Sequence, residues 1–320
     1  MQTFKHLNTK IMINIQENIL LAPLTSFRIG GNAKYYVEVF SVEELKEALV
    51  FAKDRKIDFY ILGGGTNLLV SDNGFAGLII KIKMNEISAN NDMIDVQAGV
   101  PLIKLINTAS QQGLSGLEKL AGIPGTVGGA VRGNAGAFSS EIKSCVKNVT
   151  AFDTEKMELK TFENEQCNFA YRTSIFKENK NLIVISTTLI LQKGEISEIQ
   201  KLATDTIMTR SARGLNGVKS AGSYFMNPVV ENEKLCQEFE KEKGVPVRNK
   251  TLPAGWVIEQ AGLLGKQIGG AEVSEKHANY IINAGEATAS DVIMLVSFVK
   301  QQVRDQFGIQ LTEEVNYLGF

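Results

Sequence analysis

The sequence predicts a soluble protein of mixed helices and strands with about two domains. Its 320 residues are about twice the length of a domain of roughly 150 residues. Hydrophobic residues make up 44% and charged residues 22%, which is the balance of a globular protein with a buried core. Segments patterned as strands alternate with segments patterned as helices along the chain. These observations favour a fold in which both element types share the core.

In the first half of the chain the expected elements start with a helix. Ser41 and Glu44 form a capping box, and apolar residues follow at helical spacing from Val42. Pro101 opens a second helix and Gly113 closes it, which is the usual asymmetry of helix ends. The expected strands are 58–62, 78–83, 146–152, 157–162 and 182–191, with 146–152 and 157–162 read as a pair.

The second half begins after a polar helical stretch from residue 196 to about 213. A helix is expected over 253–261, ended by a glycine, and a long helix follows a box-like start at Thr288 and ends before Gly308. The chain then predicts a final strand over 309–317. Alternation along that strand puts Glu313 on one face and Glu314 on the other.

Composition excludes several classes of function. Lys plus Arg is 34 and Asp plus Glu is 35, so the formal net charge of −1 argues against a nucleic-acid binder. Cys145, Cys167 and Cys236 form no CxxC pair, which indicates a reducing, cytoplasmic compartment. With only His6 and His277, a histidine-rich metal site cannot be built, and we expect no metal. No stretch approaches ~20 apolar residues, so we expect no membrane insertion.

Two glycine-rich loops are the main candidates for binding chemistry. Neither has the spacing of a dinucleotide fingerprint, and neither continues into the Lys-Ser/Thr of a P-loop. Bare backbone N–H groups in such loops can approach a phosphate, although tight turns that only glycine fits explain them equally well. Two such loops in one half favour a nucleotide cofactor. The candidate residues are Gly63, Gly64, Gly65, Thr66, Asn67 and Leu68 in the first loop and Gly122, Ile123, Gly125, Thr126 and Gly128 in the second.

A series of motifs, in the same order along the chain, resembles the UDP-N-acetylenolpyruvoylglucosamine reductase (MurB) family. The motifs lie at 25–33, 63–69, 122–130, 171–174, 222–228, 267–271, 276–279 and 313–315. Each motif alone is weak, but the set spans nearly the whole chain and is specific. The sequence is similar to the shorter form of the family, which lacks a tyrosine-bearing insertion.

The resemblance implies an α+β fold. It consists of an FAD-binding fold of two subdomains, like that of the PCMH and vanillyl-alcohol oxidase proteins, and a C-terminal α/β substrate domain. The implied boundaries are 1–84 and 85–206 for the two FAD-binding subdomains, with the strand 309–320 joined to the second, and 207–308 for the substrate domain. It further implies noncovalent FAD, NADPH as cosubstrate, a UDP-sugar substrate and a monomeric enzyme.

The resemblance also implies which side chains act. Arg172 would stabilise negative charge beside a substrate carboxylate, Ser223 would donate a proton, and Glu314 would help to stabilise the intermediate. Asn227 and His277 would contact substrate. The basic residues Arg210, Arg213 and Lys219 are reasonable partners of a diphosphate, without individual assignments.

Two other functions remain open from the residues themselves. A flavin enzyme with a different substrate explains the glycine loops, but it does not explain Arg172, Ser223 and Glu314 together. A nonenzymatic binder of flavin or sugar nucleotide would tolerate loss of these three residues, yet all three are present. A visible absorption spectrum and NADPH turnover with and without the enolpyruvyl substrate distinguish these alternatives.

Overall fold

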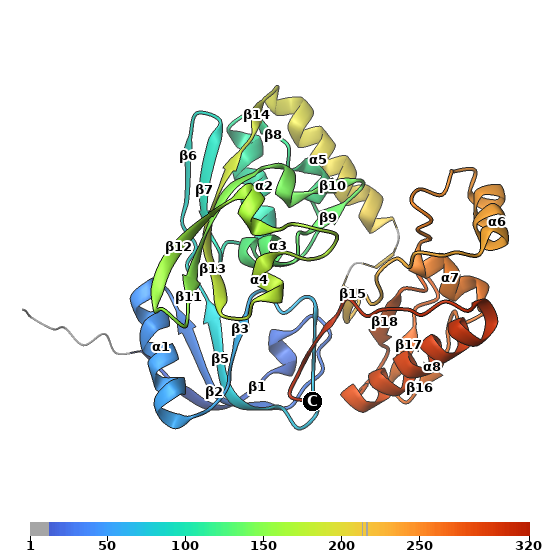
Figure 1. The fold of residues 1–320 in the computed structure, drawn as a ribbon, viewed down its shortest axis with the longest axis horizontal. Helices are drawn as coiled ribbons and strands as arrows, with labels where there is room; N and C mark the ends of the chain where they lie inside the picture. The colour runs from blue at the N-terminus through green and yellow to red at the C-terminus, as the bar shows by residue number, and fades with distance from the viewer. Residues whose placement is uncertain (1–12, 213, 216) are drawn as a thin grey trace, which may run out of the picture. The chain divides into compact units, whose positions relative to one another are not determined.

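The computed structural model describes residues 13–212, 214, 215 and 217–320. Contacts divide the chain into two compact units, each of which is built from separate stretches of sequence. Of the described residues, the first unit comprises 13–19, 33–63 and 76–200, and the second comprises 20–32, 64–75 and those from 201 to 320. The colours of Figure 1 follow the chain from the N-terminus to the C-terminus through both units.

The first unit is built around two sheets. One has the strand order β1-β2-β5-β3, with β3 parallel to β5, and the other has the order β12-β11-β13-β7-β6, with antiparallel neighbours (Figure 1). The strands are β1 (Gln16–Leu20), β2 (Asn32–Val39), β3 (Phe59–Leu62), β5 (Phe75–Ile82), β6 (Ile87–Asn90), β7 (Met93–Gln97), β11 (Val146–Asp153), β12 (Glu158–Glu163) and β13 (Leu182–Ile190). Two short antiparallel pairs join β8 (Leu114–Ser115) to β14 (Gln192–Lys193) and β9 (Gly136–Ala137) to β10 (Ser140–Glu141).

Side chains cap the starts of two helices of the first unit, α1 at Ser41 and α3 at Thr126. Ser41 accepts a hydrogen bond from the N–H of Glu44 at the start of α1, as the capping box predicts, while the Glu44 carboxylate accepts from the N–H of Phe40. α3 contacts β7 and β13 of the five-stranded sheet. The helices are α1 (Val42–Arg55), α2 (Leu102–Gln111), α3 (Val127–Arg132), α4 (Ile175–Glu178) and the short 3-10 helices Glu118–Leu120, Ile142–Ser144 and Asn164–Cys167.

The chain enters the second unit along α5 (Ile196–Ser211). There the sheet β15-β18-β17-β16 packs beside the long helix α8 (Figure 1). The apolar stripe of α8 from Val292 to Val303 is buried in the core of this unit, together with Tyr224 and Phe225. The other elements are β15 (Ser220–Ser223), β16 (Gln267–Ile268), β17 (Ala271–Val273), β18 (Tyr280–Asn283), α6 (Glu233–Lys243), α7 (Ala254–Gln260), α8 (Ala289–Phe307) and the 3-10 helix Ala22–Leu24.

The last expected strand, 309–317, is the element for which the structure differs most from the expectation. The strand β19 covers only Asn316–Leu318, and it pairs in parallel with β4 (Leu68–Val70), directly after the first glycine loop. The family resemblance joins this strand to 85–206, whereas the strand with which it pairs, β4, lies within 1–84. Alternation identifies an extended segment but not its neighbour in a sheet. The expected strands 58–62, 78–83, 146–152, 157–162 and 182–191 are confirmed within a few residues.

Among the described residues, no helix is both long enough and apolar enough to cross a lipid bilayer. His6 and Arg213, which the sequence reading considered, lie outside the described residues.

Candidate functional site

The first glycine loop connects β3 to β4. Within the described residues, the N–H groups of Gly64 and Gly65 donate no backbone hydrogen bond. The carbonyl of Gly65 accepts a hydrogen bond from the N–H of Ser26 at 3.0 Å. A Cβ atom at Gly65 would lie 2.1 Å from the carbonyl oxygen of Leu24, so only glycine fits there. The loop is therefore held by its carbonyls and leaves backbone donors for another molecule.

Asn67 carries an unsatisfied polar atom in the same loop. Its side-chain Nδ2 donates to the backbone carbonyl of Glu314 at 3.2 Å, and its own carbonyl accepts from Asn316. Its Oδ1 is buried and has no hydrogen-bond partner among the described residues. Buried polar atoms in folded proteins are almost always paired, so this oxygen fits a donor supplied by a bound molecule.

The second glycine loop leads into α3 in the first unit. Thr126 caps that helix, because its Oγ1 accepts from the N–H of Gly129. A Cβ atom at Gly63 would lie 3.0 Å from Thr126 Oγ1, so the start of the first loop reaches the second loop here. The N–H of Gly128 already donates to the carbonyl of Ala98 at 2.9 Å, so Gly128 serves close packing rather than offering a free donor. The N–H of Ile123 is also occupied, because it donates to the carbonyl of Leu120 at 3.1 Å.

In the second unit, a hollow of about 330 Å³ brings together three of the predicted site residues. Ser223, Asn227 and His277 line it although they lie up to 54 residues apart in the sequence. Lysine, glutamate and tryptophan side chains share the wall. The other lining residues are Lys243, Pro253, Gly255, Trp256, Glu259, Lys276, Ala278 and Asn279.

A bulge in β15 places Ser223 at this hollow. Ser220 pairs with Ile282 and Ser223 pairs with Tyr280, so three steps on β15 match two steps on β18. Gly222 within the bulge has φ +80°, a left-handed conformation that glycine adopts without strain. In the part of the chain that the structure describes, no hydrogen bond involves the Ser223 hydroxyl, which leaves it available to a ligand.

The segment that follows Ser223 lies beside the segment that carries Glu314. The N–H of Glu314 donates to the carbonyl of Tyr224 at 2.8 Å, and Phe225 forms an antiparallel bridge with Glu313. Because Asn67 also bonds the Glu314 carbonyl, this one glutamate joins the first glycine loop to the Ser223 segment. The structure thus brings Ser223 and Glu314 together within one unit.

The other two predicted contact residues have structural partners as well. The Oδ1 of Asn227 accepts from the N–H of Ala254 at the start of α7, which leaves the Nδ2 amide as its group for a ligand. The Nδ1 of His277 accepts from the N–H of Asn279 at 3.2 Å, so the neutral ring carries its proton on Nε2. A Cβ atom at Gly255 would lie 3.0 Å from the His277 ring, so this glycine makes room for it.

Arg172 belongs to the first unit, where its backbone and side chain are both constrained. It adopts φ +58° in a tight turn closed by two hydrogen bonds between Ala170 and Thr173. Its Nη2 donates to the carbonyl of Gly136 at 2.9 Å, and its carbonyl accepts from Lys177 Nζ at 2.9 Å. A non-glycine residue in this conformation costs of order 1–3 kcal/mol, and such strain is concentrated at functional sites.

Comparison with known proteins decides the family. A model described as "FAD binding domain" matches residues 33–157, and one described as "UDP-N-acetylenolpyruvoylglucosamine reductase, C-terminal domain" matches residues 214–318. The UDP-N-acetylenolpyruvoylglucosamine reductase of Solibacter usitatus is 39% identical and covers 93% of this chain and 95% of its own length. That of Carboxydothermus hydrogenoformans is 40% identical, with 98% and 97% covered. The chain belongs to the UDP-N-acetylenolpyruvoylglucosamine reductase family.

Among solved structures, a reductase of this family from Thermus caldophilus superposes with a TM-score of 0.74 at 30% identity. It covers 96% of this chain and 100% of its own. Membership of the reductase family confirms the expected α+β fold with an FAD-binding domain, and it confirms a flavin-dependent oxidoreductase. Both glycine loops lie in the stretch matched by the FAD model, and Ser223, Asn227, His277 and Glu314 lie in the stretch matched by the C-terminal model.

The residues of the first loop fit FAD. The buried Asn67 Oδ1 needs a donor, and the N–H groups of Gly64 and Gly65 need an acceptor. A flavin dinucleotide offers hydroxyl donors and a diphosphate acceptor, which suits this set of groups.

Bulky substitutions in the loops should release the cofactor. We expect Gly64→Val and Gly125→Val each to weaken FAD binding roughly tenfold or more, about 1.4 kcal/mol, because a side chain blocks backbone approach. The absorbance of the purified variants at flavin wavelengths measures occupancy. Two matched controls are Gly285→Val and Gly244→Val, where a Cβ atom meets nothing within 4 Å and Gly244, like Gly125, has a positive φ. Full occupancy in both loop variants would show that the loops are not the cradle.

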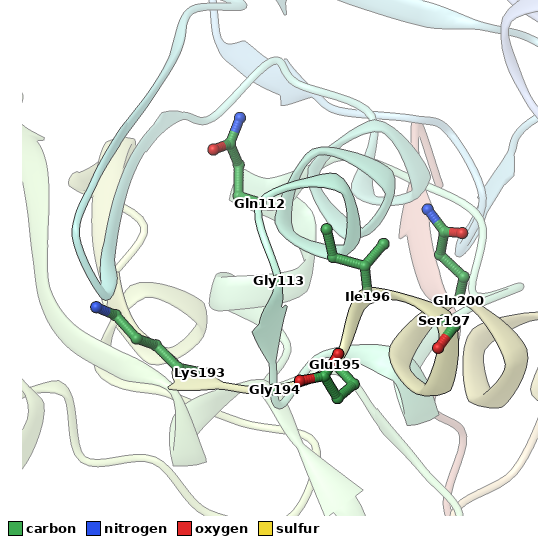
Figure 2. A pocket seen from close by; sticks show the side chains of 8 residues that line it. All are labelled: Gln112, Gly113, Lys193, Gly194, Glu195, Ile196, Ser197 and Gln200. Atoms are coloured by element: carbon green, nitrogen blue, oxygen red, sulfur yellow. The ribbon is translucent and has the colours of Figure 1, made fainter.

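A second hollow and two of the predicted basic residues do not belong to this site. A larger hollow of about 610 Å³ lies where the end of α2 meets the start of α5, and none of the predicted site residues lines it (Figure 2). Nor do Arg210 and Lys219 line the Ser223 hollow, whose cations are Lys243 and Lys276. Among the described residues, no group of three or more His, Cys, Asp or Glu side chains could hold a metal.

Sequence reasoning missed several residues of the site. Lys243 comes from α6, which no motif identified, and Trp256 comes from the expected helix 253–261 without a proposed role. Asn279 was part of a matching motif but had no assigned function. The Lys-His-Ala-Asn sequence was the available signal, because a polar residue that becomes buried at the start of a strand needs a hydrogen-bond partner.

Proposed function

We propose that this protein reduces UDP-N-acetylglucosamine enolpyruvate to UDP-N-acetylmuramate, with FAD as cofactor and NADPH as the source of the hydride. This reaction belongs to peptidoglycan precursor synthesis. The observation that carries the proposal is the hollow in which Ser223, Asn227 and His277 meet, in a chain of this reductase family. Its size and its mixed polar and aromatic wall suit a sugar nucleotide.

The protein's own residues would divide the work as follows. Bound FAD supplies hydride chemistry that no side chain can provide. Arg172 would hold the substrate carboxylate through its two parallel donors, and Ser223 would give a proton to the carbon beside that carboxylate. Glu314 in its protonated form would donate a hydrogen bond to the charge that develops there. Lys243 and Lys276 would face the diphosphate, since ammonium groups bind phosphate as point charges.

We propose that FAD is bound without a covalent tether. Cys145 and Cys167 are both buried in the first unit. Burial, with Glu118 nearby, raises the pKa of the Cys145 thiol to about 11, and burial beside Glu163 and Glu165 raises the pKa of Cys167 to about 12. Both thiols therefore stay protonated at neutral pH and are poor nucleophiles.

Arg172→Lys should slow the reoxidation of reduced flavin by the enolpyruvyl substrate roughly 10- to 100-fold. A lysine keeps the charge but loses the fork, which removes about one hydrogen bond to a charged group, worth about 1.5–3 kcal/mol. Stopped-flow absorbance would follow flavin reduction by NADPH and its reoxidation separately. Arg55→Lys, at the exposed end of α1, is the control for an arginine-to-lysine change. Wild-type reoxidation in Arg172→Lys would remove Arg172 from the mechanism.

The proposed function is tested by a paired turnover assay. NADPH oxidation by the flavin-loaded protein is measured with and without UDP-N-acetylglucosamine enolpyruvate, and the sugar product is identified by mass. We expect rapid NADPH oxidation only with the enolpyruvyl substrate, and a product heavier by two hydrogen atoms. Equal rates with and without that substrate, and no reduced sugar, would favour a flavin enzyme of different specificity. A protein without flavin absorbance would favour a binding protein.

A further inference from the structure

Asn279 is a buried polar residue whose side chain and main chain are both engaged. Its side chain is only 3% exposed, and it contacts Phe225 through two hydrogen bonds of 2.9 Å. The Nδ2 amide donates to the Phe225 carbonyl, and Oδ1 accepts from the Phe225 N–H. The Asn279 carbonyl accepts from the N–H of Tyr224 at 2.7 Å, and its N–H donates to His277 Nδ1 at 3.2 Å. One residue thus joins the Ser223 segment to His277.

The regular pairing of β15 with β18 ends at Ser223. β15 ends at Ser223 after its bulge, so the residues that follow have no regular partner strand on that edge. The Asn279 side chain supplies the donor and the acceptor that a neighbouring strand would otherwise offer to Phe225. On the opposite edge, the N–H of Glu314 donates to the carbonyl of Tyr224, and the N–H of Met226 donates to the carbonyl of Thr312. The chain directly after Ser223 is therefore bonded along both edges.

We propose that Asn279 is the positioning residue for proton transfer by Ser223. It fixes the backbone at Tyr224 and Phe225 and so sets the direction of the Ser223 hydroxyl in the hollow. Through its N–H it also keeps the proton of neutral His277 on Nε2. This inference rests on the proposed function, because it assigns proton transfer to Ser223. It adds a residue that does not itself touch the reacting atoms.

Asn279→Asp separates positioning from simple structural support. The carboxyl group has almost the same shape as the amide. In its ionised form it accepts from the Phe225 N–H but cannot donate to the Phe225 carbonyl. In its neutral form its O–H restores that donor. Burial of this position raises the pKa of such a carboxyl, so the neutral form is present below that pKa and is lost above it.

We expect the rate constant for flavin reoxidation at saturating substrate to fall up to ~10²-fold in Asn279→Asp near pH ~8, which is the usual effect of a small displacement of a catalytic group. The substrate concentration that gives half of this rate should change little. The deficit should shrink as the pH is lowered toward ~5. The charged or titratable neighbours His277, Lys276 and Glu314 are the same in both proteins, so the ratio of the variant rate to the wild-type rate isolates the new carboxyl. Flavin reduction by NADPH should stay normal throughout.

Asn164→Asp is the matched control. Asn164 Nδ2 donates to the backbone carbonyls of Lys143 at 2.9 Å and Val146 at 2.6 Å, in the first unit. The same chemical change there should leave the reoxidation rate near that of the wild type. A reoxidation rate of Asn279→Asp equal to the wild type, a deficit that does not vary with pH, or equal slowing of both half-reactions would each overturn the proposal.

A measurement without substrate completes the test. In Asn279→Ala, hydrogen exchange followed by mass spectrometry should be faster in the peptide that contains residues 223–226, and unchanged in peptides of the five-stranded sheet. Unchanged exchange at 223–226 would overturn the positioning role. Failure of the wild type to reduce the enolpyruvyl substrate would instead reject the proposed function, and the exchange result would still report whether Asn279 holds this segment.

Discussion

Replacing Ser223 by alanine should leave flavin reduction by NADPH near normal and should slow flavin reoxidation by the enolpyruvyl substrate ~10²–10⁴-fold, the usual cost of losing a positioned proton donor. Hydride transfer to flavin needs no proton from a serine, whereas reduction of the enolpyruvyl carbon leaves a carbanion-like centre that must be protonated. The Ser223 hydroxyl lies at the hollow, and no hydrogen bond to it is present in the described chain, so alanine removes no structural contact of that hydroxyl.

Stopped-flow traces of the flavin band measure the two half-reactions in one experiment. Ser220→Ala is the matched control, because Ser220 lies in the same strand and, among the described residues, its hydroxyl accepts only a long 3.4 Å hydrogen bond from the N–H of Gly222. We expect both half-reactions of the control to be near those of the wild type. If Ser223→Ala reoxidises at the normal rate, the proton comes from another group and the serine is structural.

Local signals predicted the elements that depend on local physics. The Ser41 cap, the Thr288 box and the positive φ of Gly308 each appear at the helix end where the sequence put them. The final strand was misplaced for the opposite reason. Its partner β4 lies some 250 residues earlier in the chain, and a pattern of alternating side chains contains no information about that partner. Long-range pairing needs the tertiary structure or a family resemblance.

In the candidate site, too, local features could be predicted from the sequence, whereas long-range contacts could not. The glycine loops follow from backbone freedom, which single residues reveal. The meeting of Ser223 with Glu314, 91 residues later, depends on a main-chain bridge that no spacing predicts. The roles of Arg172, Ser223 and Glu314 came from resemblance rather than from residue chemistry. Asn279 went unassigned because an asparagine beside a strand has no chemical signature until its partners are known.

Glu314→Ala should slow flavin reoxidation ~10²–10³-fold, the cost of losing one group that stabilises developing charge. The main chain of Glu314 is held by Tyr224 on one side and by Asn67 on the other, so the side chain starts from a fixed point between the Ser223 segment and the glycine loop. Glu314→Gln keeps an N–H donor at this position. It should therefore retain more activity than Glu314→Ala if the role is donation of a hydrogen bond.

Glu313 is the neighbour that tests this placement. Its carboxylate binds Lys300 Nζ of α8 at 2.7 Å, with both side chains partly buried. It also lies near Tyr317, where burial is the main factor that raises the tyrosine pKa to about 12. Glu313→Ala should therefore lower the free energy of unfolding, by up to about 1 kcal/mol for a partly exposed ion pair, and should change the reoxidation rate little. Urea unfolding and stopped-flow absorbance measure the two effects. If Glu313→Ala stalls reoxidation while Glu314→Ala does not, the catalytic carboxylate is one residue earlier in the chain.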